Sequence, residues 1–483
     1  MGEDLTASHA WRPAMADGNV AGVLPATPML ISRPRPARLR QQERHLATTT
    51  GREAERMQAA TASSMRRRAL VAGCIGNFVE WYDFALYGAF ATIIATTFFS
   101  ERDPVSALLA TYWIFVVAFL ARPAGALLFG HFGDRLGRRR ALAATILLMA
   151  LVTAGTGMLP GYAAIGWPAP VLLALLRAGQ GVAVGGEYGG SAVLVVEYAP
   201  ADRRGWYGGW QWATVGLGFA AGIGAAALLG ATLPVFALHS WGWRLPFLLA
   251  LPLGLIGLYI RIRLDETPGF RALQQRGAVA RVPLADALHT ARRQVVVGFG
   301  VVAAVSLTFN VFFVFLPSYV ATTGRTELPR AFAAAFAGLV VASAAAPMFG
   351  GLSDRIGRRP VLLAGTVTLL VVTVPASSLV QRGGTVEMLL GYSLIGLALG
   401  SLALTAFLAE LFPTRLRYSG LSLTYGIASA LFGGTAPFVA ALLAQQTGNA
   451  RLPAWYAACV TAVAVVCVVM APETADRPLD TDE

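Results

Sequence analysis

The chain contains no lysine, so its 38 basic side chains are all arginines. Charge of either sign is scarce, because charged residues make up 13% of the 483 positions, whereas soluble domains typically carry about 25%. Hydrophobic residues reach 56%, and the mean hydropathy is +0.59. This composition excludes a set of ordinary soluble domains and predicts a protein with many membrane-spanning segments.

Cysteine is rare as well, and Cys74, Cys459 and Cys467 all lie within apolar runs. Their placement excludes a disulfide framework and predicts no metal site. The net charge of +12 does not indicate nucleic-acid binding, because the arginines cluster at the ends of apolar runs and not along one helical face. The sequence has no phosphate-binding loop and no nucleophile–base pair, so we do not expect an enzyme.

Apolar stretches of roughly 20 residues or more follow one another from position 69, each long enough to cross a ~30 Å hydrocarbon core as a helix. They lie near 69–99, 107–130, 140–160, 168–198, 208–232, 244–263, 294–322, 330–350, 360–380, 386–412, 418–443 and 453–471. The sequence therefore predicts an all-α membrane protein with twelve transmembrane helices in two six-helix bundles. Pro317, Pro347 and Pro437 predict kinks in three of these helices.

The spans divide the chain into an N-terminal bundle at 65–263, a linker at 264–293, a C-terminal bundle at 294–472 and a tail at 473–483. The linker is polar and long enough to hold a short amphipathic helix. Residues 1–64 are rich in Arg, Ala, Thr and Pro and lack an apolar core, which predicts disorder. The alternative is that translation starts at Met65, just before the first apolar run.

A loop of glycine and charge separates the second and third spans and recurs between the eighth and ninth. The residues shared at an offset of 220 positions are Gly130, Asp134, Arg135, Gly137, Arg138 and Arg139, which return as Gly350, Asp354, Arg355, Gly357, Arg358 and Arg359. Two further repeats relate the halves. Glu197 and Arg204 return as Glu410 and Arg417, and Glu266-Thr267 returns as Glu473-Thr474. The chain is therefore interpreted as a duplication. Parallel six-span halves with a binding site where they meet are a transporter architecture.

The arginines also predict orientation. Most of those outside the spans lie on the even-numbered connections, among them Arg138, Arg203, Arg358 and Arg415. Positive charge is retained on the cytoplasmic side of a membrane. We therefore expect both termini in the cytoplasm.

From about residue 69 to 474 the chain resembles the major facilitator superfamily. The repeated loop carries this resemblance, and three stretches narrow it: GNFVEWYDF at 76–84, the run from Arg177 to Tyr188, and DETPGF at 265–270. They are similar to the metabolite:proton symporter group, whose members carry α-ketoglutarate, citrate, shikimate, and proline or betaine. The resemblance implies a multi-pass transporter of the bacterial inner membrane, embedded in the lipid bilayer, with the proton as coupling ion and no cofactor. It implies no nucleic-acid or obligatory protein partner.

Charged residues inside the first two spans are candidates for proton coupling. Gly76, Asn77, Glu80, Asp83 and Tyr87 recur at three- and four-residue steps and form one polar stripe on an apolar helix. Lipid cannot solvate this stripe, so it must face the bundle interior. Asp83 and Glu80 are therefore expected to take up the transported proton, the alternative being a structural ion pair. Arg122 of the second span lies at the depth of Glu80 and is its expected partner, with gating or substrate contact as the other possibility.

The fourth span supplies further candidates. Arg177, Gln180, Glu187 and Tyr188 share one face of this helix. The guanidinium of Arg177 suits a carboxylate, which belongs either to the substrate or to the protein itself. Glu187 lies about 15 Å deeper and is a further candidate for the proton.

The second half of the chain is poorer in buried charge. By resemblance its cavity-lining candidates are Asn310, Tyr319 and Tyr425, which complete a predicted substrate site with Arg177, Arg122, Gln180, Tyr87 and Tyr188. The alternative for each of the three is a hydrogen bond between helices. The resemblance also implies a cytoplasmic gate made by Asp134, Arg135, Arg138, Glu197, Arg204, Asp354, Arg355, Arg358, Glu410 and Arg417. Such charge networks form in one conformation and break in the other.

These observations predict proton-coupled uptake, by alternating access, of a small metabolite that carries a carboxylate and is anionic. A zwitterion such as proline or betaine is the alternative substrate class. A proton-coupled exporter of lipophilic compounds is the alternative direction of transport, and the buried Arg177 argues against it because an apolar cargo offers that charge no partner.

Overall fold

The computed structural model describes residues 37–99, 104–277, 291–475 and 477–479. The chain divides into two units, Met1–Ala60 and Thr61–Glu483, and the second contains the candidate site. Helix α1 (Ala37–Ala89) begins directly after Pro36. Residues 37–64 are thus helical, which differs from the expected disorder. This stretch has no proline and is rich in Ala, Arg, Gln and Glu, which favour helix. Residues 1–36 lie outside the described residues.

The expected first span consists of the end of α1 and of α2 (Ala91–Phe98), with a break at Phe90. The other spans of the first half are α3 (Pro104–Leu136), α4 (Arg138–Met158), α6 (Pro168–Tyr198), α7 (Arg204–Thr232) and α9 (Arg244–Ile262). Short turns connect them: α5 (Tyr162–Ile165), η1 (Ala201–Arg203), α8 (Val235–Ala237) and η2 (Leu238–Gly242).

The second half repeats this order. Its spans are α12 (Arg292–Asn310) with η3 (Val311–Phe315) and α13 (Leu316–Thr322), α14 (Leu328–Ile356), α15 (Arg358–Val380), α16 (Thr385–Gly400) with α17 (Leu404–Leu411), η4 (Thr414–Leu416) with α18 (Arg417–Ala428), η5 (Ser429–Gly434) and α19 (Ala436–Thr447), and α20 (Leu452–Met470).

In the described part of the chain, 11 helical segments are long and apolar enough to cross a membrane. The expected first span is helical but is not among them, because Asn77, Glu80 and Asp83 lower its hydropathy. Adding it to these segments gives the twelve predicted spans, and the predicted all-α membrane fold is confirmed.

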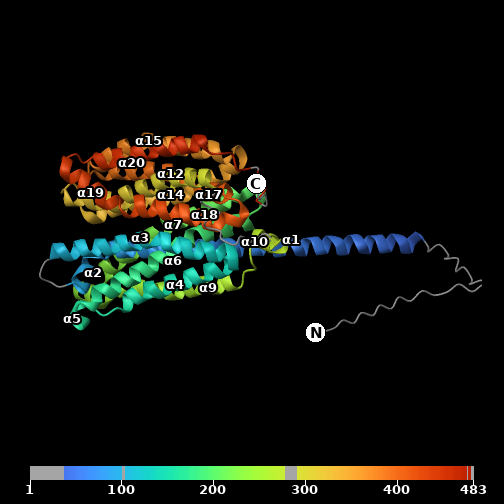
Figure 1. The fold of residues 1–483 in the computed structure, drawn as a ribbon, viewed down its shortest axis with the longest axis horizontal. Coiled ribbons are helices and arrows are strands. Elements are labelled where there is room, and N and C mark those ends of the chain that lie inside the picture. Colours follow the sequence, from blue (N-terminus) through green and yellow to red (C-terminus); the bar gives the residue numbers. More distant parts are fainter. Residues whose placement is uncertain (1–36, 100–103, 278–290, 476, 480–483) are drawn as a thin grey trace, which may run out of the picture. The chain divides into compact units, whose positions relative to one another are not determined.

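Two helix bundles lie side by side within the unit Thr61–Glu483 (Figure 1). In the first bundle α3 packs along α6 and α4 along α9, whereas in the second α12 packs along α20 and α14 along α16. The bundles contact each other along α7, which packs against α14, and along α18, which packs against both α3 and α6. Any site shared by the two halves must therefore lie among these helices and the central α1 and α12.

Two of the three expected proline kinks coincide with widened helical turns. The π-helical segment η3 directly precedes α13, where Pro317 stands in the first turn, and η5 precedes α19 with Pro437 in the same position. Proline lacks an N–H and crowds the carbonyl one turn earlier, which favours such local changes of hydrogen bonding. Helix α14 continues through Pro347.

The linker contains the short amphipathic helix that its length suggested, α10 (Pro268–Gln275). Thr267 caps it by accepting a hydrogen bond from the backbone N–H of Phe270. Phe270 and Leu273 are buried, whereas Arg271 and the two glutamines are exposed. Residues 278–290 of the linker lie outside the described residues.

Candidate functional site

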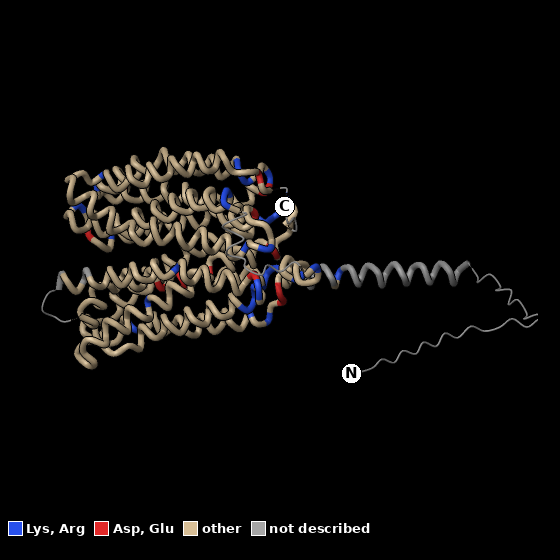
Figure 2. Tube along the Cα trace, in the orientation of Figure 1, with Lys and Arg blue, Asp and Glu red and all other residues tan. Residues whose placement is uncertain are grey.

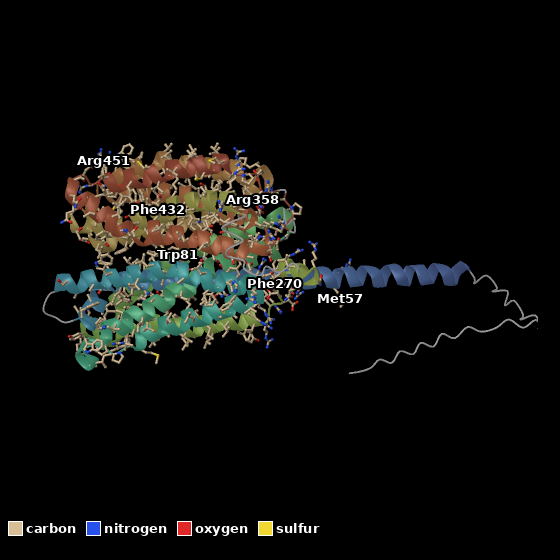
Figure 3. All side chains as sticks on the ribbon, in the orientation of Figure 1. Met57, Trp81, Phe270, Arg358, Phe432 and Arg451 are labelled. Carbon is tan, nitrogen blue, oxygen red and sulfur yellow. The ribbon has the colours of Figure 1, made fainter. Side chains whose placement is uncertain are left out.

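The two copies of the loop motif lie at one end of the bundles, which we call the loop-motif end. Figure 2 shows charged residues gathered there, and Figure 3 places Arg358 at this end and Arg451 at the opposite one. Gly137 and Gly357 have φ values of 114° and 102°, a backbone conformation that side chains other than hydrogen rarely allow. Glycine thus permits a tight turn between the paired helices in both copies.

The aspartate of each motif binds a helix of the other bundle. Asp134 at the end of α3 accepts hydrogen bonds from the backbone N–H groups of Tyr418 (3.3 Å) and Ser419 (2.8 Å), in the first turn of α18. Asp354 at the end of α14 accepts from Gly205 (2.7 Å) and Trp206 (2.9 Å), in the first turn of α7. A carboxylate is favoured at a helix N-terminus, because it satisfies free N–H groups and meets the positive end of the helix dipole.

Arginine–glutamate pairs reinforce these contacts. In the first half Arg138 binds Glu197, and Glu197 also binds Arg417 of the second bundle at 2.6 Å. In the second half Arg358 binds Glu410 at 3.0 Å and Asp354 at 2.7 Å, while Arg204 of the first bundle lies 3.8 Å from Glu410. Eight of the ten predicted gate residues thus form two related clusters that join the bundles. The remaining two, Arg135 and Arg355, are exposed.

Glu266 and Glu473 belong to the Glu-Thr pair that is repeated in the two halves of the sequence. Each of them caps the helix that follows one of the two motifs. Glu266 accepts from the N–H groups of Arg138 (3.1 Å) and Arg139 (3.2 Å) at the start of α4. Glu473 accepts from Arg358 (2.8 Å) and Arg359 (3.0 Å) at the start of α15. Burial alone would raise the pKa of Glu473, but the backbone N–H groups that it binds lower it below its ordinary value.

The C-terminal tail adds backbone acceptors to the loop-motif end. Arg204 donates to the carbonyl oxygen of Arg477 at 2.9 Å, and Arg417 donates to that of Leu479 at 2.9 Å. Thr414 also donates to Leu479. This contact was not predicted from the sequence, because a short tail has no periodic pattern that indicates where it packs.

The first buried charge pair within the spans joins Asp83 of α1 to Arg177 of α6. Two guanidinium nitrogens of Arg177 donate to the two carboxylate oxygens of Asp83, at 2.6 Å and 3.4 Å, and neither side chain is exposed. Gln180 bonds both residues and also donates to Thr153 at 3.3 Å. The guanidinium lies 4.1 Å from the ring centre of Tyr87. In this conformation Arg177 therefore has a partner within the protein, which is one of the two alternatives expected for it.

The second pair joins Glu80 of α1 to Arg122 of α3 at 3.3 Å, which confirms the expected partnership. Arg122 also donates to Ser429 of the second bundle at 3.4 Å. Beside this pair Tyr188 and Tyr425, one from each bundle, stack with their ring centres 3.7 Å apart. These residues therefore lie where the two halves of the molecule meet.

The third pair joins Glu187 to Arg261, a residue of α9 that sequence reasoning did not single out. Two guanidinium nitrogens bind the two carboxylate oxygens, and Thr145 donates to one of them at 2.6 Å. Arg261 also bonds the carbonyl oxygens of Ala72 and Leu142. Gly76 makes room, because a side chain there would overlap both charged groups. Glu187, the further candidate for the proton, is thus bonded at both carboxylate oxygens by residues of the first bundle.

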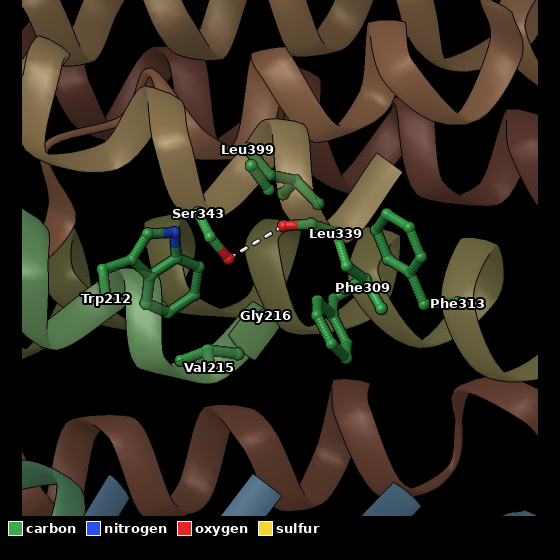
Figure 4. A pocket seen from close by; sticks show the side chains of 9 residues that line it. Trp212, Val215, Gly216, Phe309, Phe313, Leu339, Ser343 and Leu399 are labelled. Atoms are coloured by element: carbon green, nitrogen blue, oxygen red, sulfur yellow. Dashed lines mark hydrogen bonds between the residues drawn. The ribbon is translucent and has the colours of Figure 1, made fainter. Parts of the chain in front are cut away.

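The remaining candidates from the second half do not join these pairs. Asn310 donates to the carbonyl oxygen of Ser306 in its own helix, and Tyr319 packs on Phe315 one turn away. Aromatic rings fill the middle of the interface, where Trp81 meets Phe309 with ring centres 5.0 Å apart. A small apolar pocket lies beside them, lined by α7 and by side chains of the second bundle (Figure 4).

Comparison with known proteins identifies the family. A model described as "Sugar (and other) transporter" matches residues 69–287 and 283–482. The chain belongs to this family. It is a transporter of the major facilitator type and a multi-pass membrane protein, and the resemblance noted in the sequence is confirmed.

Several relatives in the family are similar over most of their length. The glycine betaine/proline/ectoine/pipecolic acid transporter OusA of Dickeya dadantii is 36% identical over 86% of this chain and 84% of its own. The inner membrane metabolite transport protein YhjE of Escherichia coli is 36% identical over 90% of this chain and 99% of its own. The alpha-ketoglutarate permease of the same organism is 35% identical over 85% and 94%.

Solved structures of the xylose transporter XylE share the fold. The proton:xylose symporter bound to 6-bromo-6-deoxy-D-glucose superposes with a TM-score of 0.73 at 17% identity, over 86% of this chain and 98% of the other. The inward-open form from E. coli superposes less well, with a TM-score of 0.61 at 17% identity over 85% and 97%. At this identity the likeness establishes the architecture and not the cargo.

Proposed function

We propose that this protein takes up a small carboxylate-bearing metabolite together with protons, by alternating access between its two bundles. The relatives of the transporter family support a small metabolite as cargo, since their names include betaine, proline and α-ketoglutarate. The name of YhjE and the arginine pattern support a bacterial inner membrane with both termini in the cytoplasm.

The observation that carries the proton coupling is the buried pair of Asp83 and Arg177. Asp83 is fully enclosed and accepts hydrogen bonds from Arg177 and Gln180 within the first bundle. Protonation of this carboxyl would remove the charge that holds Arg177. One proton can thereby change the net charge buried within the first bundle. We assign the proton to Asp83 and a structural role to Glu187, because its partner Arg261 is also tied to the backbone carbonyl oxygens of Ala72 and Leu142.

The loop-motif end supports a gate that is closed in this conformation. The bonds of Asp134 and Asp354 to helices of the opposite bundle must break before that end can open, and so must the pairs of Glu197 with Arg417 and of Glu410 with Arg204. With the termini in the cytoplasm, this gate faces the cytoplasm.

Reconstituted vesicles test the coupling. With an inward proton gradient we expect wild-type protein to accumulate radiolabelled proline or α-ketoglutarate, since one proton crossing 100 mV provides about 2.3 kcal/mol. Asp83→Asn should lose this uphill accumulation and retain exchange of labelled for unlabelled cargo, because asparagine cannot carry the proton. Asp202→Asn, which removes the same charge from an exposed site, is the control. Normal accumulation by Asp83→Asn would show that Asp83 does not carry the coupled proton.

A further inference from the structure

The two buried pairs on α1 differ in what surrounds them. Around the pair, Asp83 and Arg177 contact Gln180, and Arg177 also lies over the rings of Tyr87 and Phe247, all within the first bundle. Arg122, in contrast, reaches Ser429 of the second bundle. A cargo site must touch both bundles if their rocking is to move it from one side to the other, whereas a proton site can remain within one of them. By this criterion Glu80 and Arg122 are better placed for cargo.

The pair of Glu80 and Arg122 also has unused bonding capacity. A single contact of 3.3 Å joins the two groups, and one carboxylate oxygen of Glu80 and the Nε of Arg122 have no hydrogen-bond partner among the described residues. The pair of Glu187 and Arg261 shows the alternative, since both carboxylate oxygens and all three guanidinium nitrogens are bonded there. Unsatisfied buried charge is costly. A ligand that completed these bonds would recover that cost.

Aromatic residues surround the pair. Phe119 and Phe84 lie 4.2 Å and 4.9 Å from the guanidinium of Arg122. The stacked rings of Tyr188 and Tyr425 belong to opposite bundles, so they must separate when the bundles move apart. Once separated, each ring offers a face to a cation, and such faces attract ammonium groups.

We propose that Glu80 and Arg122 are the two charge-recognising groups for a zwitterionic substrate. Arg122 binds the carboxylate of the cargo, Glu80 faces its ammonium group, and Tyr188 and Tyr425 close over that group. This inference deepens the proposed function and rests on it. Insertion of a zwitterion replaces one ion pair by two, so that neither buried charge loses its counter-charge. A dianion would face Glu80 with like charge, and a cation without a carboxylate would leave Arg122 unpaired.

Equilibrium binding to the purified full-length protein tests this assignment without any proton gradient. The probes are proline and glycine betaine as zwitterions, choline as a cation without a carboxylate, and α-ketoglutarate as a dianion, all measured by titration calorimetry. We expect wild-type protein to bind both zwitterions roughly tenfold or more tightly than the other two probes. Tighter binding of α-ketoglutarate than of both zwitterions would overturn the proposal, whatever the variants show.

The variants should shift selectivity in opposite directions. Arg122→Gln should weaken zwitterion binding roughly tenfold or more and favour choline, because Glu80 is left without its cation. Glu80→Gln should weaken zwitterion binding and favour α-ketoglutarate, because Arg122 is left free. If each variant changed the binding affinity of all four probes by the same factor, the assignment would be overturned. The conservative variants Arg122→Lys and Glu80→Asp apply the same test if either glutamine variant fails to fold.

Two controls separate this proposal from the proton-coupling step. Arg263→Gln removes an exposed arginine of the first bundle and should leave the order of the probes unchanged. Asp83→Asn should lose uphill uptake and keep the preference for zwitterions. If Asp83→Asn accumulates cargo normally but the selectivity shifts at Glu80 and Arg122 are found, the proton assignment fails and the zwitterion site stands.

Discussion

The two halves of this transporter are alike at the loop-motif end and unlike in the middle of the membrane. At that end each half offers an aspartate to a helix of the other, an arginine–glutamate pair and a capping glutamate. Within its spans the first half contains three buried ion pairs, two of them deep in the bundle, whereas the described ion pairs within the second half lie at helix ends. Duplication accounts for the matching contacts at the loop-motif end, and the residues that we propose for coupling and cargo recognition lie mostly in the first half.

The cost of buried charge explains this asymmetry. A charged side chain at mid-membrane costs about 2.5–3.5 kcal/mol on insertion scales, so an ion pair is retained only where it has a use. The gate needs matching contacts from both halves, because it must close symmetrically around the interface. A proton site does not need a duplicate. The second half contributes the uncharged residues Ser429 and Tyr425 to the interface and so avoids the cost of a charged side chain within the membrane.

The largest expected effect concerns the third pair and separates structure from coupling. Arg261→Met leaves Glu187 as a buried charge without its cation and should cost about 3–5 kcal/mol of unfolding free energy. The double variant Glu187→Leu/Arg261→Met removes both charges and should regain most of this loss. Denaturant unfolding in detergent measures the stability, and proton-driven uptake measures the function. Loss of uphill uptake by a well-folded double variant would show that Glu187 takes part in proton coupling.

The next effect tests whether the two gate clusters are equivalent. Asp134→Asn and Asp354→Asn each weaken charge-assisted hydrogen bonds between the bundles, so each should shift the balance toward an open loop-motif end by roughly tenfold. Spin labels at the exposed positions of Arg135 and Arg355 would report the opening as a longer distance. A shift in one variant alone would contradict the equivalence of the two halves.

The smallest effect concerns the capping glutamates. Glu473→Gln and Glu266→Gln should each cost about 1 kcal/mol at neutral pH, as for the loss of other helix caps. Because the folded state lowers the pKa of Glu473, its contribution is present above the ordinary glutamate pKa of 4.5 and is lost as pH falls through the lower folded value. The stability difference between wild type and Glu473→Gln should therefore shrink below pH 4.5. A difference independent of pH would contradict the role of its charge.

Much of the fold could be predicted because membranes impose simple rules. Apolar runs long enough to cross the bilayer are visible in the sequence, and the repeated loop predicts where the halves correspond. The partnership of Glu80 with Arg122 also followed from helix geometry, since both lie at similar depth. Arg261 was missed because it stands near the end of its span, where an arginine is ordinarily read as an anchor at the membrane surface.

The sequence by itself determined that the chain is a duplicated membrane transporter, because hydropathy and repetition depend on the order of residues alone. It also determined which charges are too costly to face lipid. Only the tertiary structure decided which acid meets which arginine, and so separated Glu187, whose arginine is tied to backbone carbonyl groups, from Asp83 and Glu80. Partners of this kind come from helices distant in the sequence, and their contacts depend on how the helices are rotated and packed.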